Sequence, residues 1–350
     1  GVMNSWFAIL GIAGDPGAKD RQADLPELCT LLAGCLHAAI GRDGYPTEDI
    51  GYGSSVAAGL ALTTSLVQRA GHYDGTTDCP RLLKVGQALL HFMQPWGEHL
   101  TNTGDHSDDL DSREYIFSYL AAINGDPTLS WLVEQLRYPP VPANKDKAGK
   151  PFWLEVPLAP GRRRPASLMS LLGLRFHAKP QPPDKRGIAT QFCDRDRGIV
   201  AVRGCWDPLS TFAVFDGSQR SPGCAGHHHD SSGNFTLSAL GEYFAIDCGR
   251  YCLEQNQHNL VLINGKSGRS TGGEWSCNYN PGRLTRFEPN PFCDFASADS
   301  STQHDCYWAW RSFGLVKCEA VPPHAGDCPP TYAWLVDDLN LANDWGEYWW

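Results

Sequence analysis

Two kinds of hydrophobic periodicity divide the chain. In its first 137 residues, apolar side chains recur at intervals of three and four, which is the spacing of one face of an α-helix. This spacing predicts helices over residues 23–40, 54–70, 82–92, 112–123 and 128–136. Stretches rich in Gly and Asp separate them, so we expect short helices joined by loops, as in α/α solenoids and toroids.

From residue 199 onward the apolar positions instead follow a period of two, which is typical of strands. This part of the pattern predicts strands over residues 199–206, 211–216, 234–240, 243–247, 259–264, 307–316 and 332–336. A run of helices followed by a run of strands favours an α+β fold with segregated layers over alternating βαβ units. We therefore expect a stack of antiparallel sheets after the helices.

The segment between these halves fits neither period. Ten prolines fall between Pro139 and Pro183, and proline at this density blocks both helices and central strands. We expect a helical domain over residues 1–137, a proline-rich connector over 138–188 with one short helix at 166–174, and a β domain over 189–350. The aromatic-rich C-terminal segment resembles an interrupted strand, so we expect a fragment that lacks both ends.

Composition narrows the function classes. Apolar residues make up 42% of the 350 residues and charged residues 19%, which favours a folded core over disorder. A net charge of −10 argues against non-specific nucleic-acid binding. No apolar run reaches the roughly 18–20 residues that span a bilayer, so we expect no membrane span. The 13 cysteines include no C-x-x-C pair, which argues against a zinc ribbon.

A run of three histidines carries the clearest chemistry. In an extended chain alternate side chains share a face, so His227 and His229 point one way and His228 the other. Asp247 closes the next predicted strand, and His258 begins the one after it. Two imidazoles, a carboxylate and a water suit Zn²⁺. The spacing therefore predicts a metal site, with a His-rich loop that binds nothing as the alternative.

These motifs occur in the order of a known family. An Arg/Trp strand is followed by His-x-His, Phe-Thr-Leu, a strand closed by Asp, and a His-Asn pair, at residues 202–206, 227–229, 234–237, 245–249 and 258–265. Upstream, residues 42–52 contain Asp-Gly, Glu and Tyr at matching positions, and residues 102–105 form a Gly-Asp turn. The chain resembles the heparinase II/III superfamily of polysaccharide lyases. That resemblance implies an incomplete α/α toroid followed by an antiparallel β-sandwich.

The resemblance also implies a chemistry, the β-elimination of glycans that contain uronic acids. Tyr52 would be the acid and, for one substrate epimer, also the base, while His227 would be a second acid/base or would neutralise the substrate carboxylate. Asn4 would hydrogen-bond that carboxylate, and Glu48 would orient Tyr52 or a sugar hydroxyl. Ser5 stands where several members of the family have His. Further candidates for sugar or carboxylate contact are Arg203, Arg250 and Tyr251.

By the same resemblance, a structural zinc ion would be bound by His229, Asp247 and His258 and would hold His227 in place. The expected partner is an acidic polysaccharide or oligosaccharide, and the expected location is secreted or periplasmic. Two other functions stay open: a non-catalytic glycan-binding protein on the same scaffold, and a hydrolase with a catalytic zinc. Each residue also has a plain structural alternative, such as a helix-capping tyrosine at Tyr52 or a structural ion pair at Arg203.

Overall fold

The computed structural model describes residues 23–69, 73–96, 100–106, 117–121, 125–137, 178–223, 226–250, 252–269, 280–304, 306–317, 331–341 and 346–349. Asn4, Tyr251 and the short helix expected at residues 166–174 lie outside these ranges.

The first part of the chain is helical, as predicted. The helices are α2 (Leu25–Ala39), a π-helical turn η2 (Asp49–Gly53), α3 (Ser54–Arg69), α4 (Gly75–Asp78), a 3₁₀ turn η3 (Pro80–Lys84), α5 (Val85–His91) and α7 (Pro127–Arg137). Residues 117–121 are helical as well. The helix expected at 82–92 is a 3₁₀ turn that passes into α5. None of the described helices is long and apolar enough to cross a membrane.

Two antiparallel sheets follow the helices. A five-stranded sheet has the order β1 (Gln191–Asp194), β2 (Ile199–Arg203), β3 (Phe212–Asp216), β4 (Asn234–Ala239) and β5 (Glu242–Ala245). A four-stranded sheet has the order β10 (Tyr332–Asn340), β9 (Trp308–Val316), β8 (Cys293–Asp299) and β7 (Arg283–Glu288). A third, small sheet pairs β6 (Leu262–Ile263) with β11 (Tyr348–Trp349).

Three of these strands escape the hydrophobic pattern. The sequence does not predict β1, β7 or β8, and the strand expected at 259–264 is reduced to the two residues of β6. In β8 the side chains buried on the inner face include Ala296 and Ala298, which give a weak hydrophobic signal. In β7 exposed positions alternate only irregularly with partly buried ones, because its pairing with β8 contains a bulge between Leu284 and Arg286.

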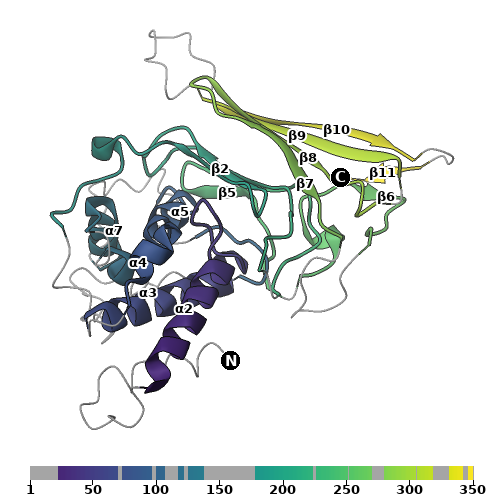
Figure 1. The fold of residues 1–350 in the computed structure, drawn as a ribbon. Helices are drawn as coiled ribbons and strands as arrows, with labels where there is room; N and C mark the ends of the chain where they lie inside the picture. The colour runs from purple at the N-terminus through teal and green to yellow at the C-terminus, as the bar shows by residue number, and fades with distance from the viewer. Residues whose placement is uncertain are drawn as a thin grey trace, which may run out of the picture.

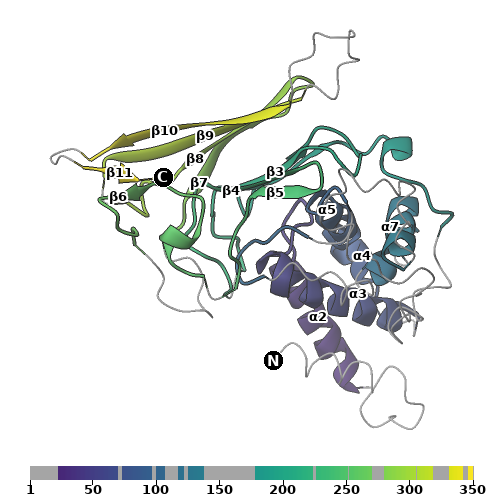
Figure 2. The same cartoon turned by 180° about the vertical axis from the view of Figure 1, so that it is seen from behind.

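The five-stranded sheet lies between the helices and the four-stranded sheet (Figures 1 and 2). Ile199 and Ala201 of β2 belong to the core formed with the helices. Val200 and Val202 belong instead to the core shared with the four-stranded sheet, where Phe215 and Phe313 stack with ring centroids 5.7 Å apart. Both faces of the central strands are buried, which explains why β2 and β3 are apolar almost without interruption.

Candidate active site and metal centre

Tyr52 and His227 meet where the helical half contacts the sheet. Tyr52 lies in η2, directly before α3, and His227 lies in the loop between β3 and β4. Their rings stack with centroids 3.7 Å apart and planes 5° from parallel. His227 has a φ of 67°, a left-handed conformation that is uncommon for a residue with a side chain. The fold thus brings together two residues that are 175 positions apart in the sequence.

Two further charged side chains surround this pair. The guanidinium carbon of Arg250 lies 5.6 Å from the centre of the Tyr52 ring, close enough for a cation–π interaction. Glu48 is half-buried and directly precedes η2. Burial raises the pKa of Glu48, and the nearby His227 opposes that shift. The site therefore combines a phenol, an imidazole, a carboxyl group and a guanidinium.

Asp105 connects His227 to the candidate metal ligands. Its Oδ2 lies 2.8 Å from Nδ1 of His227, and its Oδ1 lies 2.9 Å from Nε2 of His229. Burial alone would raise the pKa of Asp105, but its hydrogen bonds with His229 and His227 outweigh burial and lower it. One buried carboxylate thereby fixes the orientation of both imidazoles. In the sequence, Asp105 is visible only as the last residue of the Gly-Asp turn at residues 102–105, and nothing there indicates this role.

The backbone around Asp105 is equally constrained. Its N–H donates to the carbonyl oxygen of His227 at 3.1 Å, which joins the helical half to the β3–β4 loop. Gly104 has a φ of 57°, and a Cβ there would collide with the His227 carbonyl oxygen and would lie 2.7 Å from Oδ2 of Asp49. Only glycine fits this close approach without displacing a neighbour.

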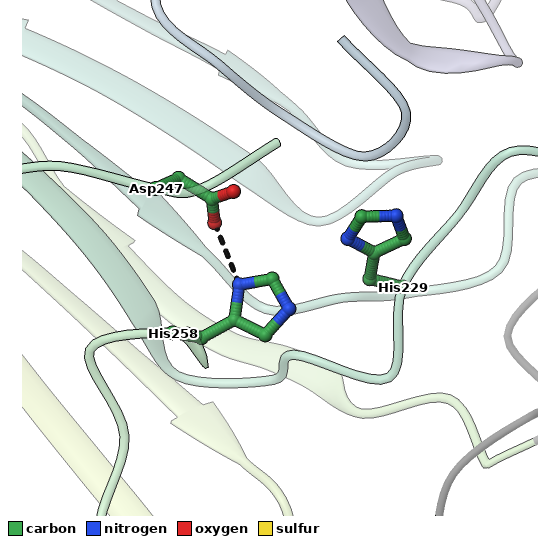
Figure 3. Close-up of side chains that lie close together, drawn as sticks. All are labelled: His229, Asp247 and His258. Atoms are coloured by element: carbon green, nitrogen blue, oxygen red, sulfur yellow. Dashed lines mark hydrogen bonds and ion pairs between the residues drawn. The ribbon is translucent and has the colours of Figure 1, made fainter. Parts of the chain in front are cut away.

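The predicted metal ligands lie together. His229, Asp247 and His258 are buried, and each offers one ligand atom within 4.8 Å of the others. Figure 3 shows His229 facing Asp247 and His258, which are joined by a hydrogen bond of 2.8 Å from Nδ1 of His258 to Oδ2 of Asp247. Two buried nitrogens, Nδ1 of His229 and Nε2 of His258, have no hydrogen-bond partner among the described residues. Because buried polar atoms are rarely left unpaired, this donor set fits a bound metal ion.

The charges in this cluster support one another. Burial alone would raise the pKa of Asp247, but attraction to His258 and their hydrogen bond lower it overall. Burial alone would lower the pKa of His258, but attraction to Asp247 and their hydrogen bond outweigh burial and raise that pKa. Asp247 also accepts hydrogen bonds from the side chain of Asn234 and from the backbone N–H of Gly249. These contacts fix the carboxylate that would face the ion.

A second buried cluster, which the sequence did not reveal, lies beside the site. Arg197 donates from Nε and Nη2 to both carboxylate oxygens of Asp49, at 2.9 and 3.0 Å. It also donates from Nη1 and Nη2 to both oxygens of Asp216, at 2.7 and 3.0 Å. Tyr45 donates to Asp49 at 3.1 Å. Asp49 begins η2, so this cluster ties the turn that carries Tyr52 to the end of β3.

The structure therefore gathers most of the predicted residues into two adjacent groups. Tyr52, Glu48, His227 and Arg250 form one group, and the three candidate metal ligands form the other. Asn4 and Tyr251 lie outside the described residues. The roles of all these residues stay predictions.

The structure places Arg203 away from the role of sugar or carboxylate contact that was expected for it. It is only 2% exposed, and its Nη2 donates to the carbonyl oxygens of His91 and Met93 at the end of α5, at 2.9 and 2.8 Å. Its guanidinium lies over the rings of Trp206 and Phe212. Burial lowers its pKa to about 9. Arg203 joins β2 to the C-terminal end of α5 rather than facing a substrate, because β2 directs alternate side chains toward the helices.

Comparison with known proteins supports the architecture at the level of the fold. No family model and no curated protein matches the chain. Among solved structures, the chain is similar to a heparinase III, with 14% identity and a TM-score of 0.59 over 90% of this chain and 44% of that one. It is also similar to the heparan sulfate lyase HepC from Pedobacter heparinus, with 13% identity and a TM-score of 0.62 over 90% of this chain and 44% of that one. The chain spans less than half the length of these proteins.

Proposed function

We infer that the protein is a polysaccharide lyase that cleaves a glycan containing uronic acids by β-elimination. The stacked contact of Tyr52 with His227 is the observation that carries this proposal. It places two groups able to move protons side by side, with the positive charge of Arg250 beside them. The fold similarity to heparan sulfate lyases supports the same class of reaction. On this proposal, the helices belong to an incomplete α/α toroid and the two large sheets form a β-sandwich.

In this reaction the C5–H bond of the uronic acid breaks, and its electron pair forms a C4–C5 double bond. The C4–O4 bond breaks at the same time, and the leaving O4 takes up a proton. Tyr52 would supply that proton and, for one epimer, would also accept the C5 proton. His227 would serve as the second acid/base. No oxidant and no water is consumed.

Negative charge builds up on the uronate carboxylate as the C5 proton leaves, so a nearby positive charge lowers the barrier. Arg250 is the described cation beside Tyr52, and we assign it the role of contacting this carboxylate. Glu48, at the start of the turn that carries Tyr52, would orient the phenol or a sugar hydroxyl. Asn4 stays a candidate for hydrogen bonding to the carboxylate.

His229, Asp247 and His258 would hold a zinc ion, which when bound would supply structural order rather than activate a substrate atom. All three ligands are at most 8% exposed, which favours a closed structural site over an open catalytic one. Through Asp105 the ion would also fix the position of His227, because Asp105 contacts His229 with one oxygen and His227 with the other. This burial is the reason to rank a zinc-dependent hydrolase below a lyase.

The direct test replaces Tyr52 with Phe and follows the ultraviolet absorbance of an unsaturated uronide during incubation with uronic-acid polymers. Loss of the phenol oxygen should lower kcat by about 10²–10⁴-fold, the usual contribution of a general acid or base. Tyr348→Phe, at an exposed tyrosine of β11, is the matched control and should keep full activity. A Tyr52→Phe variant as active as the wild type would refute the proposed role, and a glycan that binds but is never cleaved would favour the non-catalytic alternative.

A further inference from the structure

Two cysteines stand on either side of the residue whose guanidinium lies over Tyr52. Cys248 and Cys252 flank Arg250 in the segment that follows β5, and both are free thiols. Their thiols share a hydrogen bond. Among the cysteines that the structure describes, Cys248 is the exposed one, and Cys252 is half-buried. The mechanism proposed above makes no use of either sulfur.

The backbone keeps the two thiols within reach of each other. The N–H of Cys252 donates to the carbonyl oxygen of Gly249 at 3.2 Å, which closes a turn over residues 249–252. Gly249 has a φ of 71°, and a Cβ there would collide with the carbonyl oxygen of His106. The N–H of Gly249 also donates to Oδ1 of Asp247 at 2.7 Å, which fixes the chain on the other side of Cys248.

This arrangement favours a disulfide. Only three residues separate the cysteines, and closing a short loop costs less chain entropy than closing a long one. The sulfurs of a disulfide are about 2.05 Å apart, so thiols that already share a hydrogen bond need only a small further approach. An oxidant in solution can reach the exposed Cys248 first, while Cys252 is placed to react with it next.

Neither thiol belongs to the candidate metal centre. Among the described residues, His229, Asp247 and His258 are the donors close enough to share an ion, and neither sulfur joins them. An ion in that centre would therefore leave both thiols available for oxidation.

We propose that Cys248 and Cys252 are a redox-active thiol pair, which a small-molecule disulfide such as oxidised glutathione converts into a disulfide across the turn of Arg250. The sulfur of Cys248 attacks one sulfur of the oxidant, whose S–S bond breaks and releases one thiol. The sulfur of Cys252 then attacks that of Cys248, which forms the protein disulfide and releases the second thiol. The two cysteines lose two electrons and two protons, and the oxidant takes up both.

A disulfide in this turn would act on the candidate active site through Arg250. The backbone N–H of Arg250 donates to the carbonyl oxygen of His106 at 3.2 Å, and its guanidinium carbon lies 5.6 Å from the centre of the Tyr52 ring. Drawing the sulfurs together tightens the turn on which both contacts depend. Because a shift of about 1 Å in a site can cost about 10²-fold in rate, the disulfide form should turn over more slowly. This effect rests on the function inferred above, whereas the disulfide itself does not.

Peptide mapping tests the thiol pair. The full chain is incubated with oxidised glutathione, its remaining thiols are alkylated, and it is digested with trypsin, which cuts after Arg250 and so separates the two cysteines. We expect peptides 221–250 and 251–266 to be joined and to separate on reduction. One molecule of oxidised glutathione should be consumed for each link formed.

Single variants assign the bond, because peptide 221–250 also contains Cys224. Cys248→Ser should abolish the link, and Cys252→Ser should leave glutathione attached to Cys248, since no neighbouring thiol displaces it. Cys293→Ser is the matched control and should keep the link, because Cys293 is half-buried like Cys252 but lies on β8. A link that survives in Cys248→Ser, or no link in the wild type, would overturn the proposal.

Turnover and metal binding complete the test. The oxidised wild type should cleave glycan at least about tenfold more slowly than the reduced protein, a reductant should restore the rate, and Cys248→Ser should not respond. Equal rates in both states would overturn the effect on Arg250. If neither state cleaves any glycan, the lyase function falls and the peptide map still decides the thiol pair. Loss of Zn²⁺ binding in Cys248→Ser would assign that thiol to the metal centre and overturn its redox role.

Discussion

Two buried clusters lie where the helical half meets the sheets, and they differ in how completely their polar atoms are paired. Around Arg197, every guanidinium nitrogen donates to a carboxylate oxygen of Asp49 or Asp216, and all three side chains are at most 6% exposed. Around Asp247, one nitrogen of His229 and one of His258 are buried with no hydrogen-bond partner in the part of the chain that the structure describes. The two clusters are similarly buried, but they differ in the share of their polar atoms that have a hydrogen-bond partner.

This difference separates a structural network from a binding site. In a fully paired buried network every polar atom already has a hydrogen-bond partner, so none is left to bind a ligand. The positions of its side chains then depend on one another. A buried cluster with two unpaired nitrogens beside a carboxylate is unfavourable unless something binds there. The Arg197 cluster therefore positions η2, whereas the cluster of His229, Asp247 and His258 is suited to hold a metal ion.

The largest expected effect breaks the paired cluster. Arg197→Ala leaves Asp49 and Asp216 buried without a counter-charge and should lower the free energy of unfolding by about 3–5 kcal/mol. The control is Arg286→Ala, since Arg286 is 60% exposed and pairs with Glu288, which is 56% exposed. That change should cost less than about 1 kcal/mol. Urea denaturation measures the free energy of unfolding of both variants. Equal losses would show that the Arg197 cluster stabilises the fold no more than a surface ion pair does.

A smaller effect is expected at the unpaired cluster. Adding Zn²⁺ to metal-free protein at about 100 times its dissociation constant should stabilise the fold by about 2.7 kcal/mol. His258→Ala should abolish this gain. His304→Ala should retain it, because His304 is as buried as His258 but lies outside the cluster. Thermal unfolding with and without the ion measures the gain, and an equal gain in His258→Ala would place the ion elsewhere.

The smallest effect is the pH dependence of the metal-free protein. Asp247 raises the pKa of His258 above its ordinary value, so the pair contributes stability below pH about 6.5 that is lost as the pH rises through the folded-state pKa. Between pH 6.5 and 9, the wild type should lose more stability than His258→Gln. Denaturation midpoints across this range measure the difference. Parallel curves for the two proteins would show that His258 and Asp247 are not coupled.

The sequence predicts some of the helices and strands, and some of the residues in the candidate site, better than others. The period of the apolar residues predicted α2, α3 and β2–β4, where burial demands a regular pattern. It missed β7 and β8, because their inner faces rely on alanines and an interrupted register. The spacing of the three histidines, Asp247 and His258 predicts a metal site, and family resemblance predicts roles for Tyr52 and Glu48. These roles stay predictions.

Asp105, Arg197 and Asp216 could not be found in this way. Each is a common charged residue in or next to a turn, and its importance depends on a distant partner. Arg197 and Asp49, for example, are 148 residues apart in the sequence. The three-dimensional packing alone brings such residues together, and nothing in their local surroundings in the chain distinguishes them from solvated charges. For the same reason, the sequence alone does not distinguish a structural role of Arg203 from a substrate contact.

The most direct test of the proposed chemistry is the mass of the products formed in water labelled with heavy oxygen. β-Elimination transfers protons only, so the new chain ends should contain no label and one product should carry the C4–C5 double bond. Mass spectrometry of oligosaccharides released from a uronic-acid polymer would show this. Incorporation of one labelled oxygen per cleavage, with no unsaturated product, would contradict the account and identify the protein as a hydrolase.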